Sequence, residues 1–100
     1  MRHAYRLSRA AEVDLLEIWS YIVEQSESLE TADKVIAEIA QTIDSLGDFP
    51  NIGRTRDDIG KEYRSVNSGA YVIYYREVRV GVEISHILHG ARDPSLVLFD

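Results

Sequence analysis

The chain has 100 residues and no cysteine, with 45% hydrophobic residues, 28% charged residues and a formal net charge of -6. This composition indicates one globular domain over residues 1–100, and it excludes a disordered chain, a disulfide framework and a thiolate metal site. The negative charge argues against a protein that grips nucleic-acid phosphates, so we expect no direct sequence-specific nucleic-acid binding.

The N-terminal residues mix charges with apolar side chains, as in MRHAYRLSRAAEVDLLEI. This pattern lacks the continuous apolar stretch of a signal peptide, and no later run reaches the length of a membrane helix. We therefore expect a cytoplasmic protein without a membrane contact. Within this segment, His3 to Leu7 is too short and isolated for anything but a strand added to a sheet formed by later residues.

Two amphipathic helices are predicted next. Apolar residues recur at three- and four-residue steps over residues 9–25 and 29–46. Ser8 and Ser28 are the predicted N-caps, and Gly47 is placed to end the second helix. The short linker QSES makes the pair an antiparallel hairpin.

The second half of the chain is predicted to form strands. Residues 47–60 gather Gly, Pro, Asn and Asp and are expected to be a loop. Three strands follow over residues 62–67, 70–77 and 80–89, with a hairpin turn at residues 67–69. The predicted fold is α+β in the order β-α-α-β-β-β, with an antiparallel sheet of about four strands packed against the helical hairpin.

The sequence offers little catalytic chemistry. It has no nucleophile elbow, phosphate-binding loop or zinc-protease motif, and we expect no cofactor and no metal site. His86 is in register with Val82 and Ile84, which predicts a histidine at the edge of the core with one hydrogen bond. His89 ends a strand close to Arg92, where a titratable ring and a guanidinium could face a phosphate or a carboxylate.

The order of several short motifs resembles one family. YRLSRAAEVDLLEIWSYI, FPNIGR, YRSV, AYVIYY and ILHGARD are similar, in that order, to the ParE branch of the RelE/ParE toxin superfamily. The resemblance covers nearly the whole chain. It implies a four-stranded antiparallel sheet beside a helical hairpin, and a toxin of a type II toxin-antitoxin system held inactive by a ParD-like antitoxin. It also implies DNA gyrase as the target, where poisoning stalls the enzyme on cleaved DNA. Our hypothesis is that this toxin acts on gyrase by binding alone, without an enzymatic step.

Two alternatives stay open. The first is a ribosome-dependent mRNA interferase of the RelE type, whose relatives place several Lys and Arg on one sheet face. In this chain Tyr71 stands where such a strand has arginine, Val66 corresponds to a second arginine, and only Arg92 matches a basic catalytic position. One arginine and a negative net charge argue against that mechanism. The second alternative is a non-toxic binding module of the same fold.

Charge separates the two halves of the chain. Residues 12–48 carry ten acids and one base, whereas residues 54–92 carry seven bases and five acids. Our hypothesis is that the basic half contacts gyrase. The candidate contacts are Arg54, Arg56, Arg64, Arg76, His89 and Arg92.

Antitoxin capture would use a different surface. A disordered antitoxin segment that folds on binding would lay an amphipathic helix near the helical hairpin and an extended piece along a sheet edge. The terminal residues LVLF either pack back on the helices or form an edge that needs its partner. The candidate contacts are Leu16, Trp19, Val23, Leu96, Val97, Leu98 and Phe99.

Overall fold

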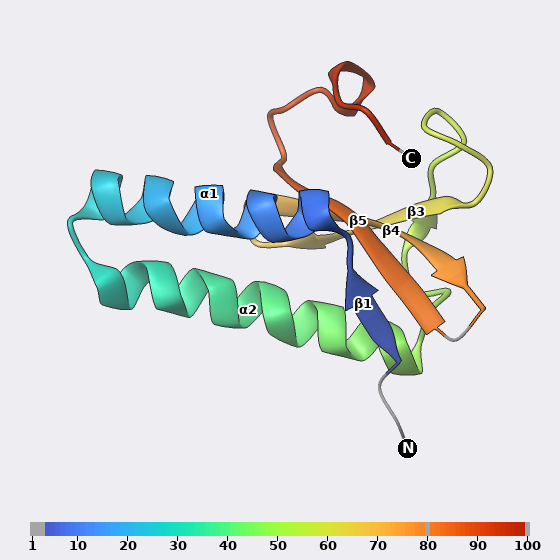
Figure 1. The fold of residues 1–100 in the computed structure, drawn as a ribbon, viewed down its shortest axis with the longest axis horizontal. Coiled ribbons are helices and arrows are strands. Elements are labelled where there is room, and N and C mark those ends of the chain that lie inside the picture. Colours follow the sequence, from blue (N-terminus) through green and yellow to red (C-terminus); the bar gives the residue numbers. More distant parts are fainter. Residues whose placement is uncertain (1–3, 80, 100) are drawn as a thin grey trace.

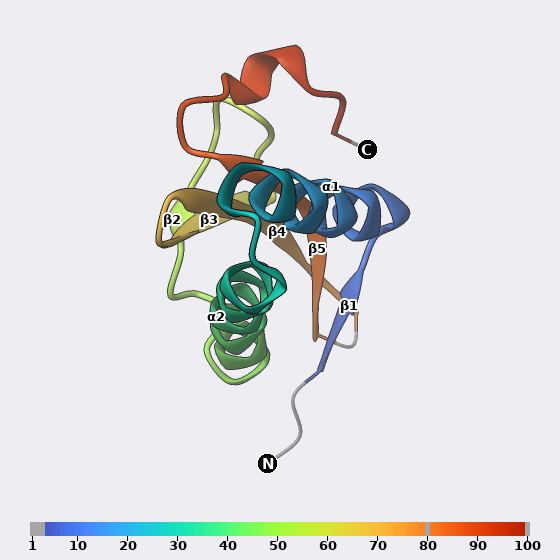
Figure 2. The same cartoon turned by 90° about the vertical axis from the view of Figure 1, so that its left-hand side faces the viewer.

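The computed structural model describes residues 4–79 and 81–99 (Figure 1). Its elements are β1 (Tyr5–Leu7), α1 (Arg9–Ser26), α2 (Leu29–Asp48), β2 (Arg54–Thr55), β3 (Tyr63–Ser68), β4 (Tyr71–Val78), β5 (Gly81–His89) and a one-turn 3-10 helix (Pro94–Leu96). The two helices run antiparallel, and the tip of their hairpin projects beyond the sheet. In Figure 2, α1 lies between α2 and the C-terminal tail.

The sheet has the order β1-β5-β4-β3-β2. Strands β2 to β5 are antiparallel to their neighbours, but β1 is parallel to β5. The α+β class and the helical hairpin are confirmed, whereas the antiparallel sheet of about four strands needs two corrections. A fifth strand, β2, lies in the segment predicted as a loop. It was not predicted because two residues are too few to show an alternating pattern of apolar and polar side chains. The sheet is mixed because β1 is parallel to β5. No hairpin turn joins these two strands, so the connection between them does not force them to be antiparallel.

The two predicted N-caps are confirmed. The hydroxyl oxygens of Ser8 and Ser28 each accept a hydrogen bond from the backbone N–H three residues on. The prediction that Gly47 ends the second helix was wrong. α2 continues through Gly47 to Asp48, and Phe49 is its C-cap. Apolar packing along α2 therefore outweighs the weak helix propensity of one glycine.

The predicted strands lie within one residue of β3, β4 and β5 where the structure describes them. The predicted hairpin is confirmed, but its turn lies at Gly69 and Ala70 and not over residues 67–69, because Asn67 and Ser68 still pair with Val72 and Tyr71. The chain reverses at Gly69, whose φ of 58° suits a residue without a side chain. His3 and position 80, where two predicted strands begin, lie outside the described residues.

The core lies between the helices and one face of the sheet. Tyr75 is fully buried there, and its hydroxyl donates to the carbonyl of Pro50 and accepts from the N–H of Gly53. These two bonds fasten the loop after α2 to the sheet. The core cluster consists of Ala11, Ile18, Ile39, Ile43, Leu46, Ile73, Tyr75, Val82, Ile84 and Ile87. No helix within the described residues is long and apolar enough to cross a membrane.

A β-bulge in β5 changes the faces of its second half. The pairing between β4 and β5 shifts so that Tyr74 faces His86 while Tyr75 faces Ile84. Ile87 consequently continues the core row of Ile84, and His86 lies on the opposite face of the sheet. The predicted register of His86 with Ile84 was therefore wrong. The extra residue could not be read from the alternation of apolar residues.

The C-terminal tail packs on that opposite face, which we call the second face. The Phe99 ring lies edge-on to the rings of Tyr63, Tyr74 and His86, with centroids 5.4, 5.4 and 5.0 Å away. His86 Nε2 also lies 3.1 Å from the carbonyl oxygen of Leu98. The alternative that residues 96–99 pack back on the helices is wrong for Phe99, whose ring is anchored on the sheet, whereas Leu98 lines a small pocket with Arg9 and Ala10 of α1.

Candidate functional site

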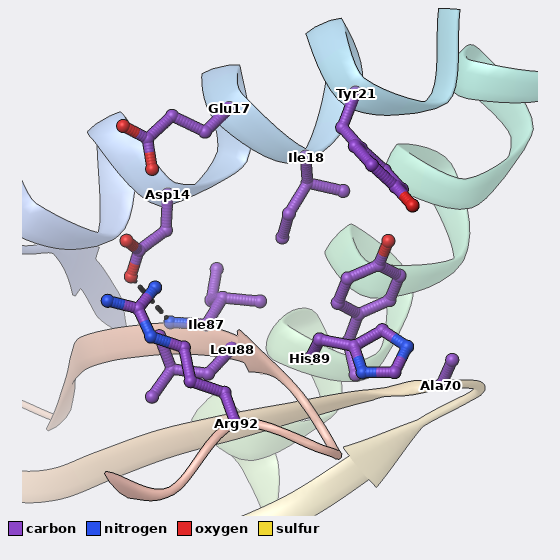
Figure 3. Close-up of a pocket in the computed structure, with 10 residues that line it drawn as sticks. Asp14, Glu17, Ile18, Tyr21, Ala70, Ile87, Leu88, His89 and Arg92 are labelled. Atoms are coloured by element: carbon purple, nitrogen blue, oxygen red, sulfur yellow. Dashed lines mark hydrogen bonds between the residues drawn. The ribbon is translucent and has the colours of Figure 1, made fainter. Parts of the chain in front are cut away.

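A groove of about 460 Å³ opens between α1 and the end of the β4–β5 hairpin (Figure 3). Ile18 from α1 and Ile87 and Leu88 from β5 give it an apolar floor. Two of the six predicted target contacts, His89 and Arg92, lie in this groove. They come together because only two residues lie between them in the chain, directly after the end of β5.

One end of the groove is aromatic. The rings of His89 and Tyr71 meet edge-on with centroids 5.5 Å apart, and Tyr21 lines the same groove from α1. His89 Nδ1 accepts from the N–H of Ala91 at 3.1 Å, so a neutral ring carries its proton on Nε2. Burial, and then the nearby Tyr21, raise the pKa of Tyr71. The Tyr71 hydroxyl is therefore protonated at neutral pH and can donate a hydrogen bond.

The other end of the groove is charged. Arg92 is exposed, and its guanidinium makes no hydrogen bond or ion pair within the described residues. Glu17 is also exposed, and its side chain likewise has no partner in the described part of the chain. A guanidinium with five free donors can bind a carboxylate or a phosphate of another molecule. The groove thus combines an apolar floor, an aromatic end and one available cation.

Asp14 has a structural role at the edge of this groove. It is only 8% exposed, and its Oδ2 accepts from the N–H of Ile87 at 2.9 Å and lies 2.7 Å from His86 Nδ1. Among the described residues, β1 pairs only with residues 82–84 of β5, and no other strand lies beside the later part of that edge. The Asp14 carboxylate supplies the acceptor that a neighbouring strand would otherwise offer to the N–H of Ile87. His86 therefore contacts two acceptors, which corrects the prediction of one hydrogen bond.

The other four predicted target contacts lie outside the groove. Arg56 is the clearest case, because its side chain is 11% exposed and its guanidinium hydrogen-bonds to Asp58 at 2.8 Å. It also lies 5.1 Å from the centre of the Tyr74 ring, on the second face. The hydrogen bond to Asp58 raises the pKa of Arg56 and lowers the pKa of Asp58. This arginine holds the loop before β3 and is not displayed to a partner.

Two more of these arginines have partners within the chain. Arg64 donates to the carbonyl of Gly53 at 2.8 Å. Arg76 pairs with Glu83 at 3.0 Å and with Glu62 at 3.8 Å. Arg54 is exposed on β2, away from His89 and Arg92. The structure therefore joins two of the six residues and separates the rest.

Sequence reasoning missed the helical wall of the groove. Asp14, Glu17 and Tyr21 come from α1, and Figure 3 shows them on the side of α1 that faces the groove. Their spacing of three and four residues was a usable signal, since such residues share one side of a helix. Among the described residues, no three His, Asp or Glu side chains are grouped as a metal site.

The predicted antitoxin contacts divide into two surfaces. Leu16, Trp19 and Val23 recur at three- and four-residue steps and form one row along α1, which we call the α1 row. Leu16 is 68% exposed, and Trp19 Nε1 donates to Asp33 of α2 at 2.8 Å. In the tail, Leu96 and Leu98 are exposed, whereas Val97 and Phe99 are half-buried. Antitoxin binding at either surface stays a prediction.

Comparison with known proteins places the chain in a family. Residues 5–94 match the family described as "ParE toxin of type II toxin-antitoxin system, parDE". The chain is 40% identical to Toxin ParE1 of Caulobacter vibrioides over 85 residues, which are 85% of this chain and 86% of that protein. A solved structure titled "Chromosomal ParDE TA system from P. aeruginosa" has the same fold, with a TM-score of 0.75, 20% identity and coverage of 86% of this chain and 94% of that one. The chain belongs to the ParE toxin family of type II toxin-antitoxin systems.

Proposed function

We propose that this toxin inhibits DNA gyrase by binding, with no enzymatic step of its own, and that a ParD-like antitoxin neutralises it in the cytoplasm. Family membership supports the toxin role. The observation that carries the contact site is the free guanidinium of Arg92 beside His89, at the mouth of an open groove. The rigid fork of arginine donors is suited to binding a partner's carboxylate or phosphate.

Poisoning by binding has a thermodynamic requirement. A protein that makes gyrase accumulate in its cleaved state must bind that state more tightly than the resealed state. Each tenfold preference corresponds to about 1.4 kcal/mol of differential binding free energy. The apolar floor of the groove, formed by Ile18, Ile87 and Leu88, is buried and fixed by the fold before binding, which limits the entropy lost on association.

The interferase alternative has weaker support. A ribonuclease of that type needs several cations around one phosphate, because negative charge develops there during cleavage. In this chain Arg56, Arg64 and Arg76 are held by acids or by a carbonyl, away from Arg92. Among the described residues that line the groove, Arg92 is the one with a guanidinium or ammonium group, and the carboxylates of Asp14 and Glu17 line the same groove. The groove therefore favours contact with a partner over phosphate chemistry.

The function is tested by two assays on one protein preparation. We expect purified toxin to inhibit gyrase supercoiling, to accumulate cleaved DNA and to leave mRNA intact on programmed ribosomes. Cut mRNA with unaffected gyrase would instead support the interferase. No effect in either assay, from a correctly folded preparation, would leave the non-toxic binding module as the explanation.

The contact site is tested by substitution. Replacing both His89 and Arg92 with alanine removes the cation and the imidazole from the groove without touching the core, so growth inhibition should be lost while the circular dichroism spectrum is retained. The matched control is the double change Lys61→Ala and Arg79→Ala, which removes two exposed cations outside the groove. The control should remain toxic. Full toxicity of the His89 and Arg92 variant would remove this groove from the mechanism.

A further inference from the structure

The last described residues of the chain fill a site on the second face of the sheet. The ring of Phe99 lies edge-on to three other rings, those of Tyr63, Tyr74 and His86, which we call the aromatic cup. Tyr63 and Tyr74 are only 4% and 3% exposed with Phe99 in place. The carbonyl oxygen of Leu98 can only accept, so His86 Nε2, 3.1 Å away, donates in that contact. The present occupant therefore shows what the cup holds: an aromatic side chain preceded by a main-chain carbonyl.

Each ring of the aromatic cup also contacts a charged side chain that lies outside the C-terminal tail. The guanidinium of Arg56 lies 5.1 Å from the centre of the Tyr74 ring, and that of Arg76 lies 6.0 Å from the centre of the Tyr63 ring. Both arginines are themselves paired with acids, which fixes their positions. The third ring is held at Nδ1 by the carboxylate of Asp14, 2.7 Å away. The cup is therefore preformed and does not depend on the tail for its shape.

Residues 93–99, which we call the strap, are attached to the rest of the protein by few contacts. Figure 1 shows the chain leaving the end of β5, turning through the 3-10 helix and coming back toward the sheet. In the described part of the chain, the hydrogen bonds and ring contacts of the strap with the rest of the protein come from Leu98 and Phe99, whereas the bonds of residues 95–97 stay inside the strap. Leu96 is 83% exposed. A segment with so few buried contacts opens more easily than the elements around it, because each ordered residue loses conformational entropy.

We propose that the aromatic cup binds an aromatic side chain of another polypeptide, and that the strap is an internal competitor that fills the cup with Phe99 when no partner is bound. The partner is an extended segment with phenylalanine or another aromatic residue, and the main-chain carbonyl just before this residue accepts from His86. Such a segment fits because Leu98 and Phe99 present the same two groups in the same order. A preformed cup needs no rearrangement to hold a second side chain of this kind. Gyrase and the groove with Arg92 play no part in this binding.

The test uses two synthetic peptides that copy the strap. One has the sequence of residues 93–99, DPSLVLF, with an amidated end and a fluorophore at its start, and the other has alanine in place of the phenylalanine. Binding to full-length toxin with the change Phe99→Ala, which removes the strap's own ring from the cup, is measured by fluorescence anisotropy. We expect this variant to bind the phenylalanine peptide at least about tenfold more tightly than the alanine peptide, because the aromatic anchor carries most of the binding. Equal binding of the two peptides, or no binding of either, would overturn the proposal.

Competition with the strap assigns the peptide to the aromatic cup. Wild-type toxin should bind the phenylalanine peptide at least about tenfold less tightly than the Phe99→Ala variant, because apparent affinity falls with the fraction of chains whose cup is open. Leu96→Ala is the matched control, since it shortens an exposed side chain of the strap and leaves Phe99 in the cup. This control should bind the peptide as weakly as the wild type does. Equal affinity of the wild type and the Phe99→Ala variant would reject the cup as the site.

A second measurement keeps Phe99 in the chain. The sequence has no cysteine, so Ser95→Cys supplies a single thiol for a nitroxide label on the exposed strap. The phenylalanine peptide should displace the strap and make the label more mobile in the electron paramagnetic resonance spectrum, whereas the alanine peptide should leave the spectrum unchanged. An unchanged spectrum at a phenylalanine-peptide concentration that saturates the wild-type toxin would show that peptide and strap do not compete, and would overturn the proposal.

Discussion

Removing the carboxylate of Asp14 should destabilise the fold more than removing the carboxylate of any exposed acid of α1. Its Oδ2 lies 2.9 Å from the N–H of Ile87 and 2.7 Å from His86 Nδ1, and it joins α1 to a stretch of β5 that β1 does not reach. In Asp14→Ala both partners lose their acceptor. Water cannot replace it easily, because the side chains of Asp14 and His86 are only 10% and 12% exposed.

The expected loss can be estimated from the two bonds. A buried N–H left without an acceptor costs about 1–3 kcal/mol, and the lost bond to His86 adds about 1 kcal/mol. We therefore expect Asp14→Ala to lower the free energy of unfolding by about 2–4 kcal/mol, out of the about 5–15 kcal/mol typical of a domain. At this chain length, that loss corresponds to a fall in Tm of at least about 8 °C. Asp14→Asn keeps an oxygen for Ile87 and should lose only about 1 kcal/mol.

The assay is urea unfolding followed by circular dichroism, with Glu17→Ala as the matched control. Glu17 lies three residues further along α1, is exposed and has no partner in the described residues. Its replacement should change the free energy of unfolding by no more than about 0.5 kcal/mol. If Asp14→Ala and Glu17→Ala unfold at the same urea concentration, the carboxylate does not hold the edge of β5 and the reasoning is wrong.

Two further outcomes are expected. Gly81→Ala should lower the free energy of unfolding by about 3 kcal/mol or more, because φ is 150° and an added Cβ would meet the carbonyl of Ala4. Gly69→Ala, at a turn with open space around it, should lower it by about 1 kcal/mol. Urea unfolding measures both values, and equal losses would contradict this account. Burial raises the pKa of Tyr75, so the stability due to its neutral hydroxyl is complete below the unfolded pKa near 10.0 and is lost as the pH rises through the higher folded value. Near-ultraviolet absorbance should show a late-ionising group of tyrosines that includes Tyr71 and Tyr75, and Tyr75→Phe should reduce its amplitude by one tyrosine; an unchanged titration would count against it.

The helices and the sheet-forming strands were predictable because their signals are local. The spacing of apolar residues in 9–25 and 29–46, together with the caps Ser8 and Ser28, depends only on neighbours within one or two turns. The closeness of His89 and Arg92 was likewise predictable, since residues three positions apart in the sequence cannot lie far apart in space. The family resemblance added the expectation of a toxin, and comparison with known relatives confirmed it.

Other features depend on contacts between segments that are distant in the sequence. The parallel direction of β1, the two-residue strand β2 and the bulge in β5 depend on pairing partners far along the chain. The same holds for charge: Arg56 and Arg76 look available in the sequence, but the folded chain supplies them with acids. Asp14 and His86 are 72 positions apart and become a buried pair. The sequence by itself determined which segments are helical, extended and acidic, because those properties are local. The tertiary structure decided which charged groups remain free for a partner, because that depends on every segment packed around them.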